Sequence, residues 1–213
     1  LVLTNAVYFN AAWAYKFDEK KTADAPFTTP DGDVSIPTMN QTEMFGYVEG
    51  DGYQAVALPY DGHELSMIIV LPEAGTFAAI EQQLTGESFQ ELVDSLSSHN
   101  VALSLPKFEF DAKYDLIPSL KSLGLSSAFT GDADFSGIDG TTDLYISGAV
   151  HKSYVRVHEG GTEAAGATAI TMGVTSVPPP PVEMKVNRPF LFAIQDHATD
   201  SIVFLGRVAS PTP

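Results

Sequence analysis

A chain of 213 residues in which 44% are hydrophobic and 10% aromatic has the composition of a folded globular protein. Its 27 acidic against 11 basic side chains give a net charge of −16, which argues against nucleic acid or an anionic membrane as a partner. The absence of cysteine excludes a disulfide framework and thiolate chemistry, and no apolar run approaches the ~18 residues that a membrane helix needs.

Strand patterns dominate the first half of the chain. Residues 1–9 and 34–46 mix apolar and polar residues in the manner of strands, and residues 53–59 and 64–71 form a predicted β-hairpin around a four-residue turn. The second arm of this hairpin is almost continuously apolar, so we expect it to be buried on both faces.

Helices and further strands follow in turn. Residues 76–84 and 85–96 are predicted amphipathic helices, the first beginning with Thr76 as its cap. Further along, we expect a strand over 101–110, a short helix over 116–124 that ends at a glycine, an acidic loop over 132–143, and strands over 182–187 and 189–195. Without a repeat or linker, the pattern favours one α+β domain.

The segment 159–169 is unusual because nearly all of its side chains are tiny. Up to Val177, its even positions become increasingly apolar while its odd positions carry Glu163 and then small or hydroxylated residues, which is the period of a strand. By itself the composition is also typical of a flexible linker. However, the segment ends in four prolines at 178–181 and two strand patterns follow, so it lies inside a folded domain as a loop able to enter a sheet.

Three blocks resemble the serpin family, in the family's order and spacing. They are LTNAVYFNAAW at 3–13, ISGAVHK at 146–152 with EGGTEAA at 159–165, and VNRPFLFAI at 186–194 with FLGRV at 204–208. The resemblance implies an α+β, serpin-like multi-sheet fold with an exposed reactive-centre loop at about 160–181. It also implies that residues 1–213 are the C-terminal fragment of a single serpin domain, with the N-terminal helical region and part of sheet A absent.

The family's mechanism would make this protein a suicide substrate of a serine protease. Counting from Glu159, the resemblance places the cut between Thr175 and Ser176, which implies an elastase-like or subtilisin-like target. A cut after Met172 is the second reading and implies a chymotrypsin-like target. The hinge that would insert into sheet A comprises Glu159, Gly160, Gly161, Thr162, Glu163, Ala164, Ala165, Gly166, Ala167 and Thr168.

The hinge sequence favours inhibition. Its inward-facing positions after insertion would be Thr162, Ala164, Gly166 and Thr168, and a charge buried there would cost several kcal/mol. The alternative is a non-inhibitory serpin that acts as a binding or chaperone protein. The hinge of such a protein would normally contain bulky or charged residues that prevent insertion.

The same resemblance implies a role in conformational control for Glu159 and for four further residues. Asn5 and His151 match a hydrogen-bonded pair at the centre of sheet A, the shutter through which the loop passes. Lys107 matches the partner of Glu159 in an ion pair near the top of that sheet, which as a surface pair would contribute ~0–1 kcal/mol. Trp13 matches the tryptophan beneath the insertion point.

The sequence carries no signature of an enzyme. It lacks a Gly-x-Ser-x-Gly elbow, a phosphate-binding glycine loop and a His-Glu-x-x-His helix, and its five histidines are scattered. We therefore expect neither a catalytic centre nor a metal or cofactor. The resemblance alone further implies an extracellular protein that is monomeric when complete.

Overall fold

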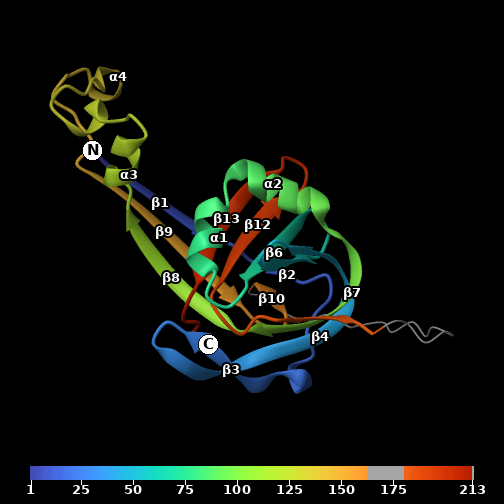
Figure 1. Ribbon diagram of the computed structural model, residues 1–213. Coiled ribbons are helices and arrows are strands. Elements are labelled where there is room, and N and C mark those ends of the chain that lie inside the picture. Colours follow the sequence, from blue (N-terminus) through green and yellow to red (C-terminus); the bar gives the residue numbers. More distant parts are fainter. Residues whose placement is uncertain (163–179, 213) are drawn as a thin grey trace. The chain divides into compact units, whose positions relative to one another are not determined.

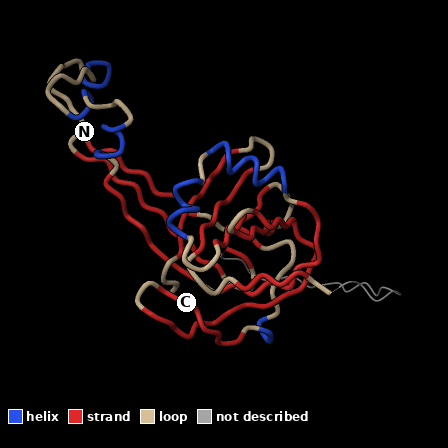
Figure 2. Tube along the Cα trace, in the orientation of Figure 1, coloured by secondary structure: helices blue, strands red, loops and turns tan. Residues whose placement is uncertain are grey.

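The computed structural model describes residues 1–162 and 180–212 (Figure 1). Strands form most of the described chain and helices are few and short (Figure 2). The chain divides into two compact units, one formed by Leu1–Phe9 and Phe110–Val155 and the other by Asn10–Glu109 and Arg156–Pro213. Whether the whole chain is one domain, as the sequence predicts, stays a prediction.

The first unit contains most of a three-stranded sheet with the order β1-β9-β8. Strand β1 (Val2–Tyr8) runs parallel to β9 (Gly148–Val157), and β8 (Phe108–Asp115) lies on the other side of β9. In the described part of this sheet β1 is therefore an edge strand, and its residues are largely exposed. An open edge of this kind is a template for pairing with another strand.

The connection from β8 to β9 carries this unit's helices. It contains α3 (Ile117–Ser122), a 3₁₀ turn η2 (Ser127–Phe129) and α4 (Ser136–Asp139). As predicted, a glycine ends the α3 region: Gly124 has φ +99°, a conformation that only glycine adopts readily. A small apolar cluster of Ala128, Phe129, Ile146 and Ala149 fills the space between these turns and the sheet.

An eight-stranded sheet forms the second unit. Its order is β11-β7-β4-β5-β6-β12-β13, with β3 paired to β4 as well. The strands are β3 (Ala23–Thr29), β4 (Gly32–Gly50), β5 (Tyr53–Pro59), β6 (Leu65–Pro72), β7 (Ser97–Pro106), β11 (Val182–Lys185), β12 (Phe190–Asp196) and β13 (Ser201–Val208). A short pair, β2 (Ala11–Ala12) with β10 (Gly161–Thr162), and a 3₁₀ turn η1 (Glu19–Lys21) complete its regular structure.

The predicted hairpin is present, with β5 and β6 antiparallel, and β6 is buried on both faces as its apolar run predicts. Strand β6 lies between β5 and β12 in the middle of the sheet. On one face Ile68 and Val70 pack with residues of α1 (Phe77–Gln83) and α2 (Gly86–Ser95), the helices that appear over the sheet in Figure 1. Met67, Ile69 and Leu71 alternate with them and are equally inaccessible.

Two local predictions were wrong. The pattern over 101–110 belongs to two strands of different sheets, because the chain leaves β7 at Pro106 and begins β8 at Phe108, with Lys107 between them. In addition, the Thr76 hydroxyl donates to the Glu73 carbonyl and does not cap α1, since its ψ of 0° departs from the extended backbone of an N-cap. Thr85, with ψ 173°, forms the capping box of α2 with Ser88.

No helix in residues 1–162 or 180–212 combines the length and the apolar character that a membrane crossing requires.

Candidate functional site

The chain leaves β9 through a tight turn and forms β10 against β2. The backbones of His158 and Gly161 exchange two hydrogen bonds of 3.0 and 3.1 Å, and Gly161 then pairs with Ala12. Gly161 has φ +144°, and a β-carbon there would collide with the backbone of Ala11, Ala12 and Trp13. Only glycine therefore fits at the point where the predicted hinge meets β2.

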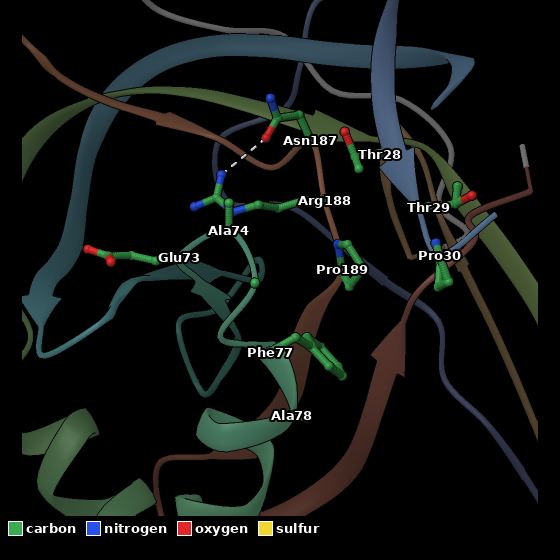
Figure 3. A pocket seen from close by; sticks show the side chains of 11 residues that line it. Thr28, Thr29, Pro30, Glu73, Ala74, Phe77, Ala78, Asn187, Arg188 and Pro189 are labelled. Carbon is green, nitrogen blue, oxygen red and sulfur yellow. Dashed lines mark hydrogen bonds between the residues drawn. The ribbon is translucent and has the colours of Figure 1, made fainter. Parts of the chain in front are cut away.

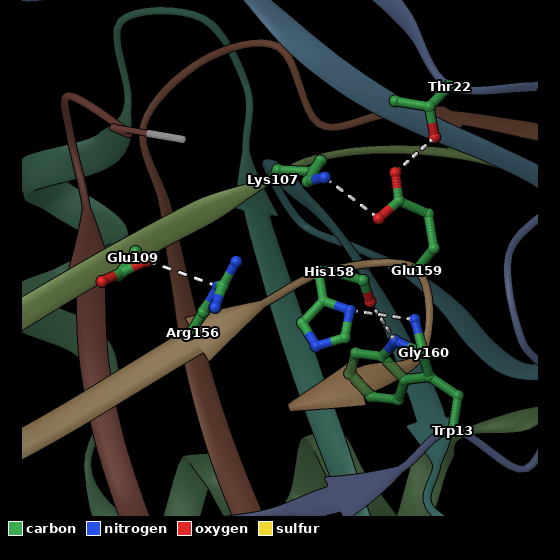
Figure 4. A network of polar contacts seen from close by, with 8 residues as sticks. All are labelled: Trp13, Thr22, Lys107, Glu109, Arg156, His158, Glu159 and Gly160. Atoms are coloured by element: carbon green, nitrogen blue, oxygen red, sulfur yellow. Dashed lines mark hydrogen bonds and ion pairs between the residues drawn. The ribbon is translucent and has the colours of Figure 1, made fainter. Parts of the chain in front are cut away.

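Glu159 is the polar centre of this turn (Figure 4). Its carboxylate accepts a hydrogen bond from the Thr22 hydroxyl at 2.8 Å and forms an ion pair with Lys107 at 3.1 Å. Burial by itself would raise the pKa of Glu159, but hydrogen bonds from its own backbone N–H and from Thr22, together with Lys107, outweigh burial and lower it. The structure thus brings together the two residues that the resemblance paired.

The expected surface location of this pair was wrong. The Glu159 side chain is only 10% exposed and that of Lys107 is 30% exposed. Glu159 is covered because its carbonyl accepts from the backbone N–H of Phe17, which holds the segment after Trp13 against the turn. A partly buried, hydrogen-bonded carboxylate interacts more strongly with its partner than an exposed one does.

Trp13 is a buried anchor for the turn. It is 2% exposed, its indole N–H donates to the His158 carbonyl at 2.9 Å, and its backbone N–H donates to the Gly160 carbonyl at 3.1 Å. Its ring stacks on Tyr60 at a centroid separation of 4.6 Å. Trp13 is therefore both a core residue and a direct contact of the predicted hinge.

Thr162 is fully buried in β10. Its hydroxyl lies 2.9 Å from the phenol oxygen of Tyr60, and burial raises the pKa of Tyr60 so that the phenol stays neutral. The first residue expected to face inward after insertion is thus already held inside the protein. The later hinge residues, namely Glu163, Ala164, Ala165, Gly166, Ala167 and Thr168, lie outside the described residues, as do Met172, Thr175 and Ser176.

Asn5 and His151 lie opposite each other in the β1–β9 pairing of the other unit. The His151 Nδ1 lies 3.0 Å from the Asn5 side-chain oxygen, and since that oxygen can only accept, the contact requires a proton on Nδ1. The Tyr114 ring stacks on His151 with a centroid distance of 6.4 Å. This cross-strand hydrogen bond links the two strands in the middle of their seven-residue register.

Three side chains contact the predicted hinge without having been predicted from the sequence: Thr22, Tyr60 and His158. Arg156 was not predicted either, and it forms an ion pair with Glu109 at 3.4 Å beside the Lys107–Glu159 pair (Figure 4). Thr22 and Glu159 are 137 residues apart and Tyr60 and Thr162 are 102 apart. No local periodicity signals contacts at such separations.

A cavity of about 520 Å³ lies elsewhere in the second unit (Figure 3). Pro30, Phe77 and Pro189 form apolar walls, and Arg188, which donates to the Pro72 carbonyl and to the Asn187 side chain, is a cation at its margin. Its lining includes no histidine, serine or cysteine. Within the described part of the chain, no three or more His, Cys, Asp or Glu side chains are grouped to hold a metal.

Comparison with known proteins places these features in one family. The family model described as Serpin (serine protease inhibitor) matches residues 1–211. An uncharacterized serpin-like protein of Thermococcus kodakarensis is 42% identical over 213 residues, covering 99% of this chain and 50% of that protein. The leukocyte elastase inhibitor of Bos taurus is 40% identical over 221 residues, covering 99% of this chain and 58% of that protein.

A solved structure of thyroxine-binding globulin in complex with thyroxine superimposes with a TM-score of 0.88 at 30% identity, covering 100% of this chain and 57% of that one. The chain therefore spans about half the length of the relatives it matches. The similar proteins thus include one named as an elastase inhibitor and one named as a thyroxine-binding globulin. The chain belongs to the serpin family.

Proposed function

We propose that this chain is the loop-bearing part of a serine protease inhibitor that is cut and consumed. In the proposed reaction the protease serine attacks the Thr175 carbonyl, the chain breaks before Ser176, and the acyl-enzyme stays attached to the loop. The freed loop then enters the sheet between β1 and β9 and carries the protease with it. The observation that carries this proposal is the direct parallel pairing of β1 with β9, the strand that leads into the hinge.

Strand polarity makes insertion favourable. A loop that turns back after β9 runs antiparallel to β9 and, because β1 is parallel to β9, antiparallel to β1 as well. Insertion would replace one parallel ladder of seven residue pairs, Val2↔Gly148 to Tyr8↔Tyr154, by two antiparallel ladders. At ~0.5–1.5 kcal/mol net for each added hydrogen bond, one extra ladder of this length stabilises the inserted state by roughly 4–10 kcal/mol.

The composition of the hinge supports inhibition over a purely binding role. Thr162 is uncharged and buried in a strand pairing, and Ala164, Gly166 and Thr168 continue the same alternation in the sequence. None of these side chains would place a charge inside the sheet, so none opposes insertion through desolvation.

The residues before the proposed cut favour a protease with a small apolar primary pocket. Val174 and Thr175 fit an elastase-like or subtilisin-like enzyme, and a cut after Met172 would fit a chymotrypsin-like one. No Lys or Arg occurs between Arg156 and Lys185, so a trypsin-like target lacks its recognition residue. The relative named leukocyte elastase inhibitor supports the first of these classes.

The test is incubation of the complete protein with elastase-like, subtilisin-like and chymotrypsin-like proteases. We expect a covalent complex that survives denaturant, with the new terminus identified by mass spectrometry next to Thr175. Two neighbouring substitutions provide a matched pair: Ala164→Arg puts a charge on the inward face of the inserted strand and should give a plain substrate, whereas Ala165→Arg faces outward and should still inhibit.

Thr162→Arg is a poorer choice for this test, because Thr162 is already buried before insertion and an arginine there would disturb the native protein itself. If all three proteases cleave the protein and remain fully active, the inhibitor proposal is wrong and a non-inhibitory binding or chaperone function takes its place. Equal behaviour of the two arginine variants would refute the proposed insertion.

A further inference from the structure

His158 holds the start of the hinge through its side chain as well as its backbone. Its ring Nδ1 accepts a hydrogen bond from the backbone N–H of Gly160 at 3.1 Å. Its carbonyl accepts from the Trp13 indole at 2.9 Å and from the Gly161 N–H at 3.1 Å. The imidazole therefore closes the turn that leads from β9 into the hinge (Figure 4).

The contact with Gly160 depends on the protonation of the ring. A backbone N–H can only donate, so Nδ1 must offer a lone pair, which it has only in the neutral, Nε2-protonated tautomer. A proton on Nδ1 would set two N–H groups against each other and remove the hydrogen bond. Histidine ordinarily takes up this proton at about pH 6.5, within the range of biological fluids.

The charged groups around His158 come mostly in pairs. Lys107 with Glu159, and Arg156 with Glu109, form ion pairs at the junctions of β7, β8 and β9. Tyr60, which stacks on Trp13, is neutral because burial raises its pKa. A proton on the His158 ring would therefore add a charge to a turn whose neighbouring carboxylates each pair with a cation.

We propose that His158 is a positioning residue for hinge opening, fixing Gly160 when its ring is neutral and releasing it when the ring is protonated. The consequence for inhibition rests on the proposed function, since a released turn allows loop insertion to begin more readily in acid. The positioning role itself is a property of the native protein before any protease is present.

Amide hydrogen exchange of the complete protein tests the positioning role directly. The readout is the protection of the peptide spanning residues 156–162, relative to the same peptide unfolded, between about pH 5.5 and 8. His158→Asn keeps an oxygen that can accept from the Gly160 N–H and does not titrate, and His158→Ala removes the acceptor. His99→Asn, an exchange at an exposed histidine of β7, is the control.

We expect the unaltered protein to match His158→Asn at about pH 8 and to be about threefold to tenfold less protected at about pH 5.5, the effect of one hydrogen bond. The alanine variant should be poorly protected throughout, and His99→Asn should follow the unaltered protein. If the protection of residues 156–162 changed with pH in the same way in the unaltered protein and in His158→Asn, the proposal would be wrong.

The outcome is separable from the inhibitor proposal. A pH-dependent turn in a protein that traps no protease would uphold the role of His158 and refute the proposed function. A protein that traps proteases but whose turn shows no pH-dependent protection would uphold the proposed function and refute the role of His158.

Discussion

A double-mutant cycle on Lys107 and Glu159 tests whether burial, rather than mere proximity, gives this pair its strength. The substitutions are Lys107→Met and Glu159→Gln, alone and together, since methionine keeps the aliphatic stem and glutamine keeps an acceptor for the Thr22 hydroxyl. The measured quantity is the coupling free energy from urea unfolding at neutral pH.

The structure sets the expected size of the coupling. An exposed pair contributes ~0.2–1 kcal/mol, whereas hydrogen bonds to charged groups with limited solvent access contribute ~1.5–3 kcal/mol. Glu159 is 10% and Lys107 30% exposed, so the pair lies between these cases and we expect a coupling of about 1.5–2 kcal/mol. The exposed pair Arg207–Glu81, at 3.2 Å, is the control and should show less than about 1 kcal/mol.

The pH dependence of this coupling has a definite sign. Folding lowers the pKa of Glu159 from its ordinary value of 4.5: burial opposes this shift, but the Glu159 backbone N–H, Thr22 and Lys107 outweigh it. The stabilisation is therefore complete above pH 4.5 and is lost as the pH falls through the lower folded-state pKa. A coupling no larger than that of Arg207–Glu81, or one that persists at pH values below the folded-state pKa, would refute the reasoning.

Two further substitutions test the packing of the turn at Gly161 and of the core strand β6. Gly161→Ala should destabilise the turn by more than about 1 kcal/mol and expose Trp13, because the new β-carbon meets the β2 backbone. Tryptophan fluorescence measures the exposure of Trp13. The control is Gly86→Ala, which should leave the fluorescence unchanged because the space around Gly86 is open. Ile69→Ala, at a fully buried position of β6, should lower the free energy of unfolding by about 2–5 kcal/mol in denaturant titration, and a loss no greater than that of the exposed Ile202→Ala would contradict the assignment of β6 to the core.

Several elements were predictable because their signals are local. The apolar run at 65–71 could be stable only with both faces covered, and its position between β5 and β12 supplies that cover. The hairpin of β5 and β6 followed from two strand patterns around a short turn. The serpin resemblance also named Asn5 with His151 and Lys107 with Glu159, and in the structure each pair lies within 3.1 Å.

Other features depended on where distant segments meet. Over 101–110 the large apolar residues stand first at odd positions, up to Leu105, and then at even positions, from Phe108, so the alternation shifts by one residue around Lys107. The chain changes sheets there, because β7 pairs with β4 and β11 while β8 pairs with β9. Alternation records which side of a strand is covered and carries no information about which strand lies beside it.

By itself the sequence determined the fold class and the positions of most strands along the chain, and it predicted a hinge whose small, alternating residues are compatible with a sheet. Only the tertiary structure decided that Glu159 and Thr162 are buried, that Thr22 and Tyr60 hold them, and that the His158 ring closes the turn. The reason is that burial and hydrogen-bond partnership belong to pairs of segments more than a hundred residues apart, whereas periodicity describes each segment separately.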